Sequence, residues 1–214
     1  MALARKQTPK GERARRQILD AVEELFVTKG FFGTSVREAA AKAGVPSASL
    51  LHHFPTKEAL YRALLDRIAE DLDSFLTPTL SPPPTDQRIG LRNFCVAYLD
   101  WTEQKPHYSS ILLREMLDNS GRMQAAKHLP MAKIVDLVRS FLREGARLGI
   151  FRPIDPFVFI CHMAGSASYF TAARPTITRL SGVKDLATIT KAHRQTLLSI
   201  LERAVLVDPG DPGG

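Results

Sequence analysis

The 214-residue sequence contains only two cysteines, Cys95 and Cys161, and both lie within apolar stretches. Two cysteines cannot build a disulfide framework, and they do not have the paired spacing of a cysteine-based zinc site. We expect both to be small packing residues.

Long apolar runs are also missing. No window approaches about 18 consecutive uncharged apolar residues, so we expect no membrane span and no membrane partner. The basic N-terminus continues into the amphipathic stretch RARRQILDAVEEL, which lacks the apolar core of a signal peptide. These absences favour a cytoplasmic protein.

Alternation of apolar and polar residues with period two, which is typical of strands, does not occur. Apolar residues instead recur at helical spacing. One stripe contains Ile18, Ala21, Val22, Leu25 and Phe26, and another contains Leu60, Leu64, Ile68, Leu72 and Phe75. The pattern predicts an all-α protein.

Capping residues and glycines predict where the first helices begin and end. The first helix should start between Pro9 and Arg13 and end at Lys29-Gly30. Thr34 or Ser35 opens the second, since Ser35 and Glu38 form a capping-box pattern, and this helix ends at Gly44. Ser47 is expected to cap a short third helix. Thr56 is expected to cap a fourth that runs to about Leu76.

The proline-rich stretch TPTLSPPPTDQ, residues 77–87, then breaks the pattern. Further helices are predicted at about 88–104, 107–119, 124–148, 155–172 and 185–206. The segment RPTITRLSGV should separate the last two, and the tail DPGDPGG at the C-terminus should be disordered.

The charge balance favours an anionic partner. The chain has 29 Lys and Arg against 22 Asp and Glu, a net charge of +7 and a pI near 9.6. Residues 1–19 include six basic residues, Arg5, Lys6, Lys10, Arg13, Arg15 and Arg16, but only one acidic residue, Glu12. The alternative is that this basic end is only a solvated tail.

The stretch GVPSASLLHHFPTKEAL, residues 44–60, combines a glycine turn with a helix too short to be stable by itself. A helix, a turn and such a short helix together are typical of a helix-turn-helix. In that motif the second helix presents its N-terminal residues to base edges, and here these are Ser47, Ala48 and Ser49. Val45, Leu50 and Phe54 would point inward. An ordinary corner between two helices is the alternative.

The first third of the chain resembles the DNA-binding domain of TetR-like (tetracycline-repressor-like) bacterial transcription regulators. The matching residues are Phe26, Gly30, Phe31, Thr34, Val36, Arg37, Ala40, Ala43, Gly44, Val45, Leu50, His53, Phe54, Lys57 and Leu60. Two positions depart from the pattern. Ala39 replaces the usual isoleucine, and Leu51-His52 stands where two aromatic residues are common.

The resemblance implies a DNA-binding domain at 12–72, with the helix-turn-helix at about 35–54. A long helix would join it to a helical ligand-binding and dimerisation domain at 73–207, with a basic arm at 1–11 and a disordered tail at 208–214. The implied function is a repressor that binds a palindromic double-stranded DNA operator as a homodimer and is released by a small molecule. The implied DNA-binding residues are Ser35, Arg37, Ser47, Ala48, Ser49, His52, His53 and Lys57.

The histidine pair is not expected to bind a metal. Adjacent helical residues point about 100° apart and do not converge on one ion as an i, i+4 pair does. We expect His52 to contact a phosphate in place of an aromatic residue, whereas His53 either packs beside Phe54 or contacts a phosphate. No cofactor is predicted.

Candidate effector-binding residues are apolar, aromatic or histidine side chains on the later helices. They are Phe94, Tyr98, Trp101, His107, Met116, Phe159, His162, Met163 and Phe170. Ordinary core packing is the alternative for each.

Two later segments are candidates for the dimer interface. The stretch FVFICHMAGSASYF, residues 157–170, is apolar on more than one face and includes small residues that permit close approach of helices. The last helix carries an apolar stripe containing Leu186, Ile189, His193, Leu197, Ile200 and Ala204. Intramolecular core is again the alternative.

Two other functions remain open. A Cys/His enzyme would use Cys95, Cys161 or His162, but Cys161 and His162 are neighbours that face different directions, and no phosphate loop or carboxylate pair appears. We therefore do not expect an enzyme. The other alternative, an architectural DNA-binding protein, would have the same fold but bind DNA without sequence preference.

Overall fold

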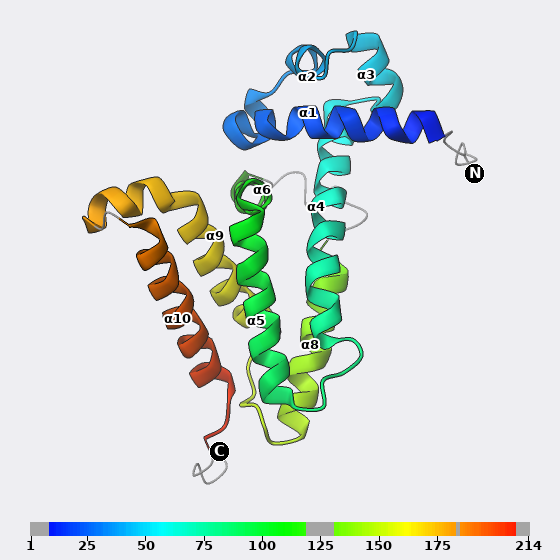
Figure 1. Ribbon diagram of the computed structural model, residues 1–214. Helices are drawn as coiled ribbons and strands as arrows, with labels where there is room; N and C mark the ends of the chain where they lie inside the picture. Colours follow the sequence, from blue (N-terminus) through cyan, green and yellow to red (C-terminus); the bar gives the residue numbers. More distant parts are fainter. Residues whose placement is uncertain (1–8, 119–130, 183–184, 209–214) are drawn as a thin grey trace. The chain divides into compact units, whose positions relative to one another are not determined.

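The computed structural model describes residues 9–118, 131–182 and 185–208, and the predicted all-α class is confirmed (Figure 1). Within those residues the regular structure is helical, apart from one isolated bridge between Phe151 and Leu206. The chain forms two compact units, Met1–Ile68 and Ala69–Gly214. Most of the predicted arm and tail, and residues 119–130, lie outside the described residues.

The first unit contains α1 (Pro9–Gly33), α2 (Val36–Lys42), α3 (Ser47–His53) and the start of α4 (Lys57–Leu80). Both α2 and α3 pack against α1, on the same side of it in Figure 1. The residues that fill its core are Ile18, Val22, Phe26, Leu50, Phe54, Leu60 and Leu64. The short α3 is thus held by its neighbours, which compensates for its low intrinsic stability.

Local sequence signals account for the breaks between these helices. Gly30 has a φ of 68° and kinks α1 at the predicted stop, although one more helical turn follows to Gly33. The capping box between Ser35 and Glu38 is confirmed. The Thr56 hydroxyl accepts a hydrogen bond from the Ala59 amide at 3.1 Å, which caps α4 as predicted.

Ser47 does not cap α3, so that prediction is wrong. Pro46 occupies the N-cap position, with extended backbone at φ −60° and ψ 146° and no side-chain hydrogen bond. The fixed φ of proline already suits the residue that enters the helix. Ser47 becomes the first helical residue, and its side chain is exposed.

The second unit contains the rest of α4, α5 (Gln87–Gln104), α6 (Pro106–Asp118), α8 (Ala132–Arg147), α9 (Pro156–Ser181) and α10 (Leu186–Val205). Helix α9 packs against α5, α6, α8 and α10 and is the central element of this unit. The core of the second unit includes Leu91, Phe94, Trp101, Phe151, Phe159 and Met163.

Two helices run past prolines that were predicted to end them. Helix α4 continues through Pro78 to Leu80 instead of stopping near Leu76, and Leu80 is buried. Helix α9 continues through Pro175 to Ser181 instead of stopping near residue 172. The Thr178 hydroxyl donates to the Arg174 carbonyl at 2.8 Å in that extension. A proline costs a helix one hydrogen bond, and packing of the adjoining turns can outweigh that loss.

In the part of the chain that the structure describes, no helix is long and apolar enough to cross a membrane.

Candidate nucleic-acid interface

One face of α3 is exposed on the first unit. Leu50 is fully buried, and the four exposed residues of this helix are Ser47, Ala48, Leu51 and His52. These four define what we call the outward face of α3. Ser49 and His53 flank the buried side and are half-buried. The side chains on the outward face are small or flat enough to let the helix backbone approach a groove.

Leu51 belongs to this face, with 39% of its surface exposed. It was not among the predicted DNA-binding residues because leucine cannot donate a hydrogen bond. An exposed leucine can still contact a thymine methyl group, so apolar base contact is available at this position.

Arg15 on α1 fixes the end of α3. Its guanidinium lies 4.2 Å from the centre of the Phe54 ring, and Nη1 donates a hydrogen bond to the His53 carbonyl oxygen. Sequence reasoning included Arg15 only in a basic run, because its partners are 38 or more residues away in the chain. Its role in this structure is to position the helix.

The two histidines have different environments. His52 is exposed, and its ring contacts that of His53 at a centroid distance of 5.5 Å. Burial lowers the pKa of His53, and the neighbouring His52 and Arg15 lower it further. His53 is therefore neutral at pH 7. Within the described residues, no group of three His, Cys, Asp or Glu side chains could hold a metal ion.

Lys57 and Ser35 make structural contacts within the first unit. The Lys57 ammonium donates to the Phe31 carbonyl at 3.0 Å and lies 4.3 Å from the centre of the Phe31 ring. The Ser35 hydroxyl is taken up by the capping box with Glu38. Of the predicted DNA-binding residues, Arg37, Ser47, Ala48 and His52 remain exposed without such contacts.

The carboxylates of the first unit are largely paired. Glu38 pairs with Lys29 at 2.5 Å, Glu24 with Lys42 at 2.6 Å, and Arg67 bridges Asp20 and Glu23. The hydrogen bonds from Lys29 and Ser35 lower the pKa of Glu38 to about 2. Among the described residues, the basic side chains without a carboxylate in ion-pair range include Lys10, Arg13, Arg16 and Arg37. An excess of positive charge is thus left for an anionic partner.

The predicted effector-binding residues in the second unit fall into two groups. Phe94, Tyr98, Trp101, Phe159, Met163 and Phe170 are buried, whereas His107, Met116 and His162 are exposed. These three side chains therefore lie at the surface, whereas the other six belong to the core of the unit.

A buried polar cluster lies among the first group. The Tyr98 hydroxyl is 3.2 Å from the Ser168 hydroxyl, and the Ser109 hydroxyl donates to Ser168 at 3.0 Å. Trp101 Nε1 donates to Asp71 Oδ1 at 2.7 Å, and Phe170 stacks on His193 at 4.0 Å. The hydroxyls and the indole nitrogen thus have hydrogen-bond partners within the unit, and the Phe170 ring is stacked.

The two cysteines have different environments, and neither is in a disulfide. Burial raises the pKa of the Cys95 thiol to about 12, so it remains protonated and is a poor nucleophile at neutral pH. Cys161 is exposed on α9.

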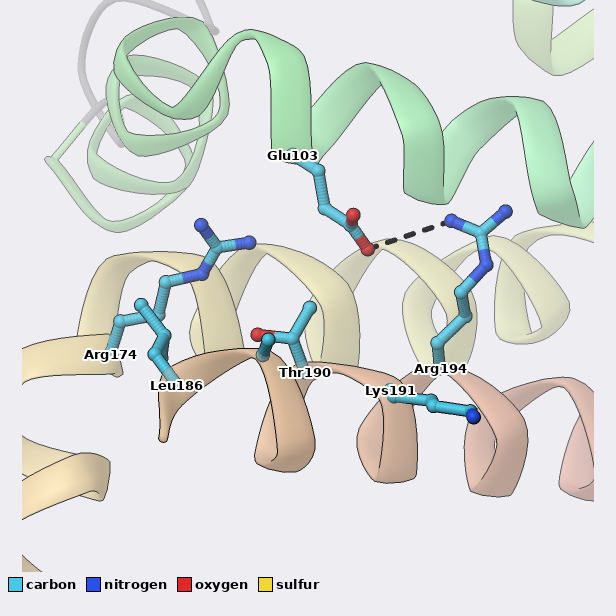
Figure 2. Close-up of a pocket in the computed structure, with 7 residues that line it drawn as sticks. Glu103, Arg174, Leu186, Thr190, Lys191 and Arg194 are labelled. Atoms are coloured by element: carbon cyan, nitrogen blue, oxygen red, sulfur yellow. Dashed lines mark ion pairs between the residues drawn. The ribbon is translucent and has the colours of Figure 1, made fainter. Parts of the chain in front are cut away.

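A pocket of about 590 Å³ lies in the second unit between α5, α9 and α10. None of the nine predicted effector-binding residues lines it. Its walls include Glu103, Arg174, Leu186, Thr190, Lys191 and Arg194 (Figure 2). Sequence reasoning missed Arg174 because α9 was expected to end before it.

Comparisons with known proteins match both units. Residues 18–64 fit the model of bacterial regulatory proteins of the tetR family, and residues 88–200 fit that of a tetracyclin repressor-like C-terminal domain. The transcriptional regulator RutR of Escherichia coli (strain K12) is 27% identical over 182 residues, which cover 83% of this chain and 84% of RutR.

A second sequence relative covers less of the chain, and a solved structure covers most of it. The transcriptional activator FasR of Mycolicibacterium smegmatis is 38% identical over 95 residues, covering 44% of this chain and 42% of FasR. The crystal structure of a TetR family transcription regulator from Marinobacter aquaeolei has a TM-score of 0.71 at 18% identity, covering 93% of this chain and 98% of that one.

The fold, the helix-turn-helix with its outward-facing α3 and these two family matches lead to one conclusion: the chain belongs to the TetR family and is a DNA-binding transcriptional regulator.

Proposed function

We propose that the protein is a repressor that binds a palindromic operator as a homodimer and is released by a small-molecule effector. The observation that carries this proposal is the outward face of α3, which is exposed on a unit whose carboxylates are mostly paired. A helix of this kind enters the major groove, while cations around it contact phosphates.

Different residues of the first unit make different kinds of contact with DNA in this proposal. Ser47 and His52 supply hydrogen-bonding groups for base edges or phosphates, and Leu51 supplies an apolar contact. Arg37 and Arg16 are exposed cations without carboxylate partners and neutralise phosphates. Arg15 and Lys57 hold the recognition helix and the end of α1 in place.

Dimerisation is supported by the side of α9 that faces away from its own unit. Exposed residues recur there at helical spacing: Val158, His162, Gly165, Tyr169 and Ala172. Val158, Tyr169 and the neighbouring Phe157 are large exposed side chains. Helix α10 exposes Ile200 together with Ala192 and Thr196. A partly apolar surface across two adjacent helices suits an isologous interface with a second copy.

A dimer also meets the demands of recognition. The outward face of α3 has only four side chains, so one copy reads a short site. Two copies related by a twofold axis read two half-sites separated by about one helical turn of DNA, about 34 Å, or a multiple of it.

Effector control follows from a difference in affinity between two conformations. A ligand that prefers the conformation unable to bind the operator weakens DNA binding by the ratio of its two affinities. Helix α4 belongs to both units as one continuous helix, and Asp71 in its second half bonds Trp101 of α5. A change in the second unit that moves Asp71 would therefore act directly on α4.

Selection of binding sites from random DNA with the purified protein, followed by titration of the selected site, tests the proposal. We expect a palindromic sequence that binds at least about 10³-fold more tightly than random DNA at the same salt concentration. The His52→Ala variant should lose part of this preference at an unchanged melting temperature. Equal affinity for all sequences would instead indicate an architectural DNA-binding protein.

A further inference from the structure

The pocket between α5, α9 and α10 has an unusual distribution of charge. Arg174 comes from α9, Lys191 and Arg194 from α10, and Glu103 from α5. Arg194 is already paired, because its Nη1 lies 2.6 Å from Asp100 and 3.5 Å from Glu103. Among the described residues, Arg174 and Lys191 have no carboxylate within ion-pair distance.

Arg174 is the pocket residue that has a buried polar atom without a hydrogen-bond partner among the described residues. Its Nε is buried and has no hydrogen-bond partner, and its guanidinium lies 5.9 Å from the centre of the Phe170 ring. A buried donor without an acceptor is destabilising, and more so when the group is charged. The side chain lines the pocket and projects into it in Figure 2, where an anion would meet the outer part of the guanidinium rather than the buried Nε.

Arg174 also stands on the inward side of α9. The exposed residues of this helix recur at 158, 162, 165, 169 and 172, which lie about half a turn around the axis from 174. Along α10, Lys191 and Arg194 likewise lie roughly opposite Thr196 and Ile200, whereas Leu186 lies on the same side as Ile200. Arg174, Lys191 and Arg194 therefore point away from the surface proposed for dimerisation, while the pocket residue Leu186 lies at its border.

We propose that this pocket binds the carboxylate of a small organic acid, with Arg174 as its principal partner and Lys191 as a second cation at the exposed side. Among the described residues, the cations Arg174, Lys191 and Arg194 stand against two carboxylates, Glu103 in the pocket wall and Asp100 paired with Arg194, which leaves one positive charge and so suits a monoanion. The planar guanidinium fork matches a carboxylate in a bidentate arrangement. Leu186 and Ala187 provide apolar surface for the organic part of the acid.

This inference deepens the proposed function, because it gives the effector a chemical class. The site and its effect on DNA are nevertheless separable. Binding of the acid depends on Arg174, whereas release of the operator requires in addition that the bound conformation disfavours DNA.

Calorimetric titration of the full chain with sodium benzoate tests the site, with benzyl alcohol as the uncharged analogue and inorganic phosphate as the alternative anion. We expect saturable binding of benzoate, and at least tenfold weaker binding of the other two. The Arg174→Gln variant should bind benzoate about tenfold or more weakly, the loss expected for one charge-assisted contact. Lys191→Gln should cause a smaller loss.

Arg179→Gln is the matched control, since Arg179 is exposed on the same helix and does not line the pocket. It should bind benzoate as the unmodified protein does. Equal affinity of the Arg174→Gln variant and the unmodified protein would overturn the proposal, and so would no saturable binding of benzoate up to about 20 mM. Phosphate binding more tightly than benzoate would overturn the assignment to a carboxylate.

If Arg174→Gln lowers the melting temperature below that of the control, Arg174→Lys serves as the second variant, because it keeps the charge but loses the fork. It should still bind benzoate less tightly. Operator titrations with and without benzoate then separate the two claims. Arg174-dependent binding that leaves operator affinity unchanged supports the site and contradicts its role as the effector site.

Discussion

The guanidinium of Arg15 on α1 lies 4.2 Å from the centre of the Phe54 ring, at the end of the recognition helix. The same side chain donates a hydrogen bond to the His53 carbonyl. One cation on the first helix thus holds the C-terminal end of α3, although α3 follows it by more than 30 residues.

Replacing Arg15 with Gln should therefore lower both stability and operator affinity. The lost cation–π contact and hydrogen bond predict a decrease in the free energy of unfolding of about 1–2 kcal/mol, measured by urea denaturation. The control is Arg16→Gln. Arg16 is exposed, so this variant should keep its stability but show a shallower salt dependence of DNA binding. Identical stability of both variants would contradict the positioning role of Arg15.

Leu51 is exposed on the outward face of α3, at a position where the TetR-like pattern has an aromatic residue. Leu51→Tyr should add a hydroxyl within reach of a phosphate and strengthen DNA binding by roughly 3–10-fold, the value of one hydrogen bond. Fluorescence anisotropy with the selected operator measures the change, and Leu51→Phe is the control without the hydroxyl. A gain of the same size in both variants would show that ring contact, not a phosphate hydrogen bond, is responsible.

The stability of the first unit should depend on the ionisation of Glu38. Hydrogen bonds from Lys29 and Ser35 lower its pKa from 4.5 to about 2, so the folded state favours the ionised form. Its contribution to stability is present above the unfolded pKa and is lost as the pH falls towards 2. The difference in melting temperature between the unmodified protein and Glu38→Gln should be constant above about pH 5.5 and shrink below pH 4.5. A difference that does not change between pH 6 and pH 3, for the full chain, would exclude this linkage.

Trp101 is fully buried, and its ring nitrogen donates to Asp71 at 2.7 Å. Trp101→Phe removes this bond and leaves a carboxylate without its donor, so it should lower the free energy of unfolding by about 2–4 kcal/mol. Asp71→Asn keeps an acceptor oxygen and should cost less. If both variants are as stable as the unmodified protein, Trp101 has another role than joining α4 to α5.

Tyr169 lies on the exposed side of α9 and has 64% of its surface free in one copy of the chain. If this side forms the dimer, Tyr169→Glu places a charge in the interface and should yield a monomer in light scattering at micromolar concentration. Ser140→Glu, on the exposed side of α8, is the control and should remain a dimer. A monomeric unmodified protein, with and without operator DNA, would refute the dimer.

Much of the first unit could be predicted from the sequence because its signals are local. The capping box of Ser35, the cap at Thr56 and the positive φ of Gly30 each depend on residues within one turn. The helical period of the apolar residues likewise gave the all-α class, and the residue order of the helix-turn-helix indicated the family.

The later boundaries were predicted less well. Pro78 and Pro175 were expected to lie beyond their helices, but the helices continue through them. Local propensity penalises proline, whereas packing of the adjoining turns depends on residues far away in the chain. The extension of α9 brought Arg174 into a pocket that no sequence pattern had indicated.

The sequence by itself determined the helices, their caps and the kind of motif that holds the recognition helix, since these depend on neighbours within a few residues. Only the tertiary structure decided which side chains contact which partners far away in the chain. Arg15 lies over the ring of Phe54, and Trp101 donates a hydrogen bond to Asp71. The buried Nε of Arg174 has no acceptor among the described residues. The physical reason is that burial and long-range pairing are properties of packed helices, and they fix the environment of a side chain that local sequence leaves undetermined.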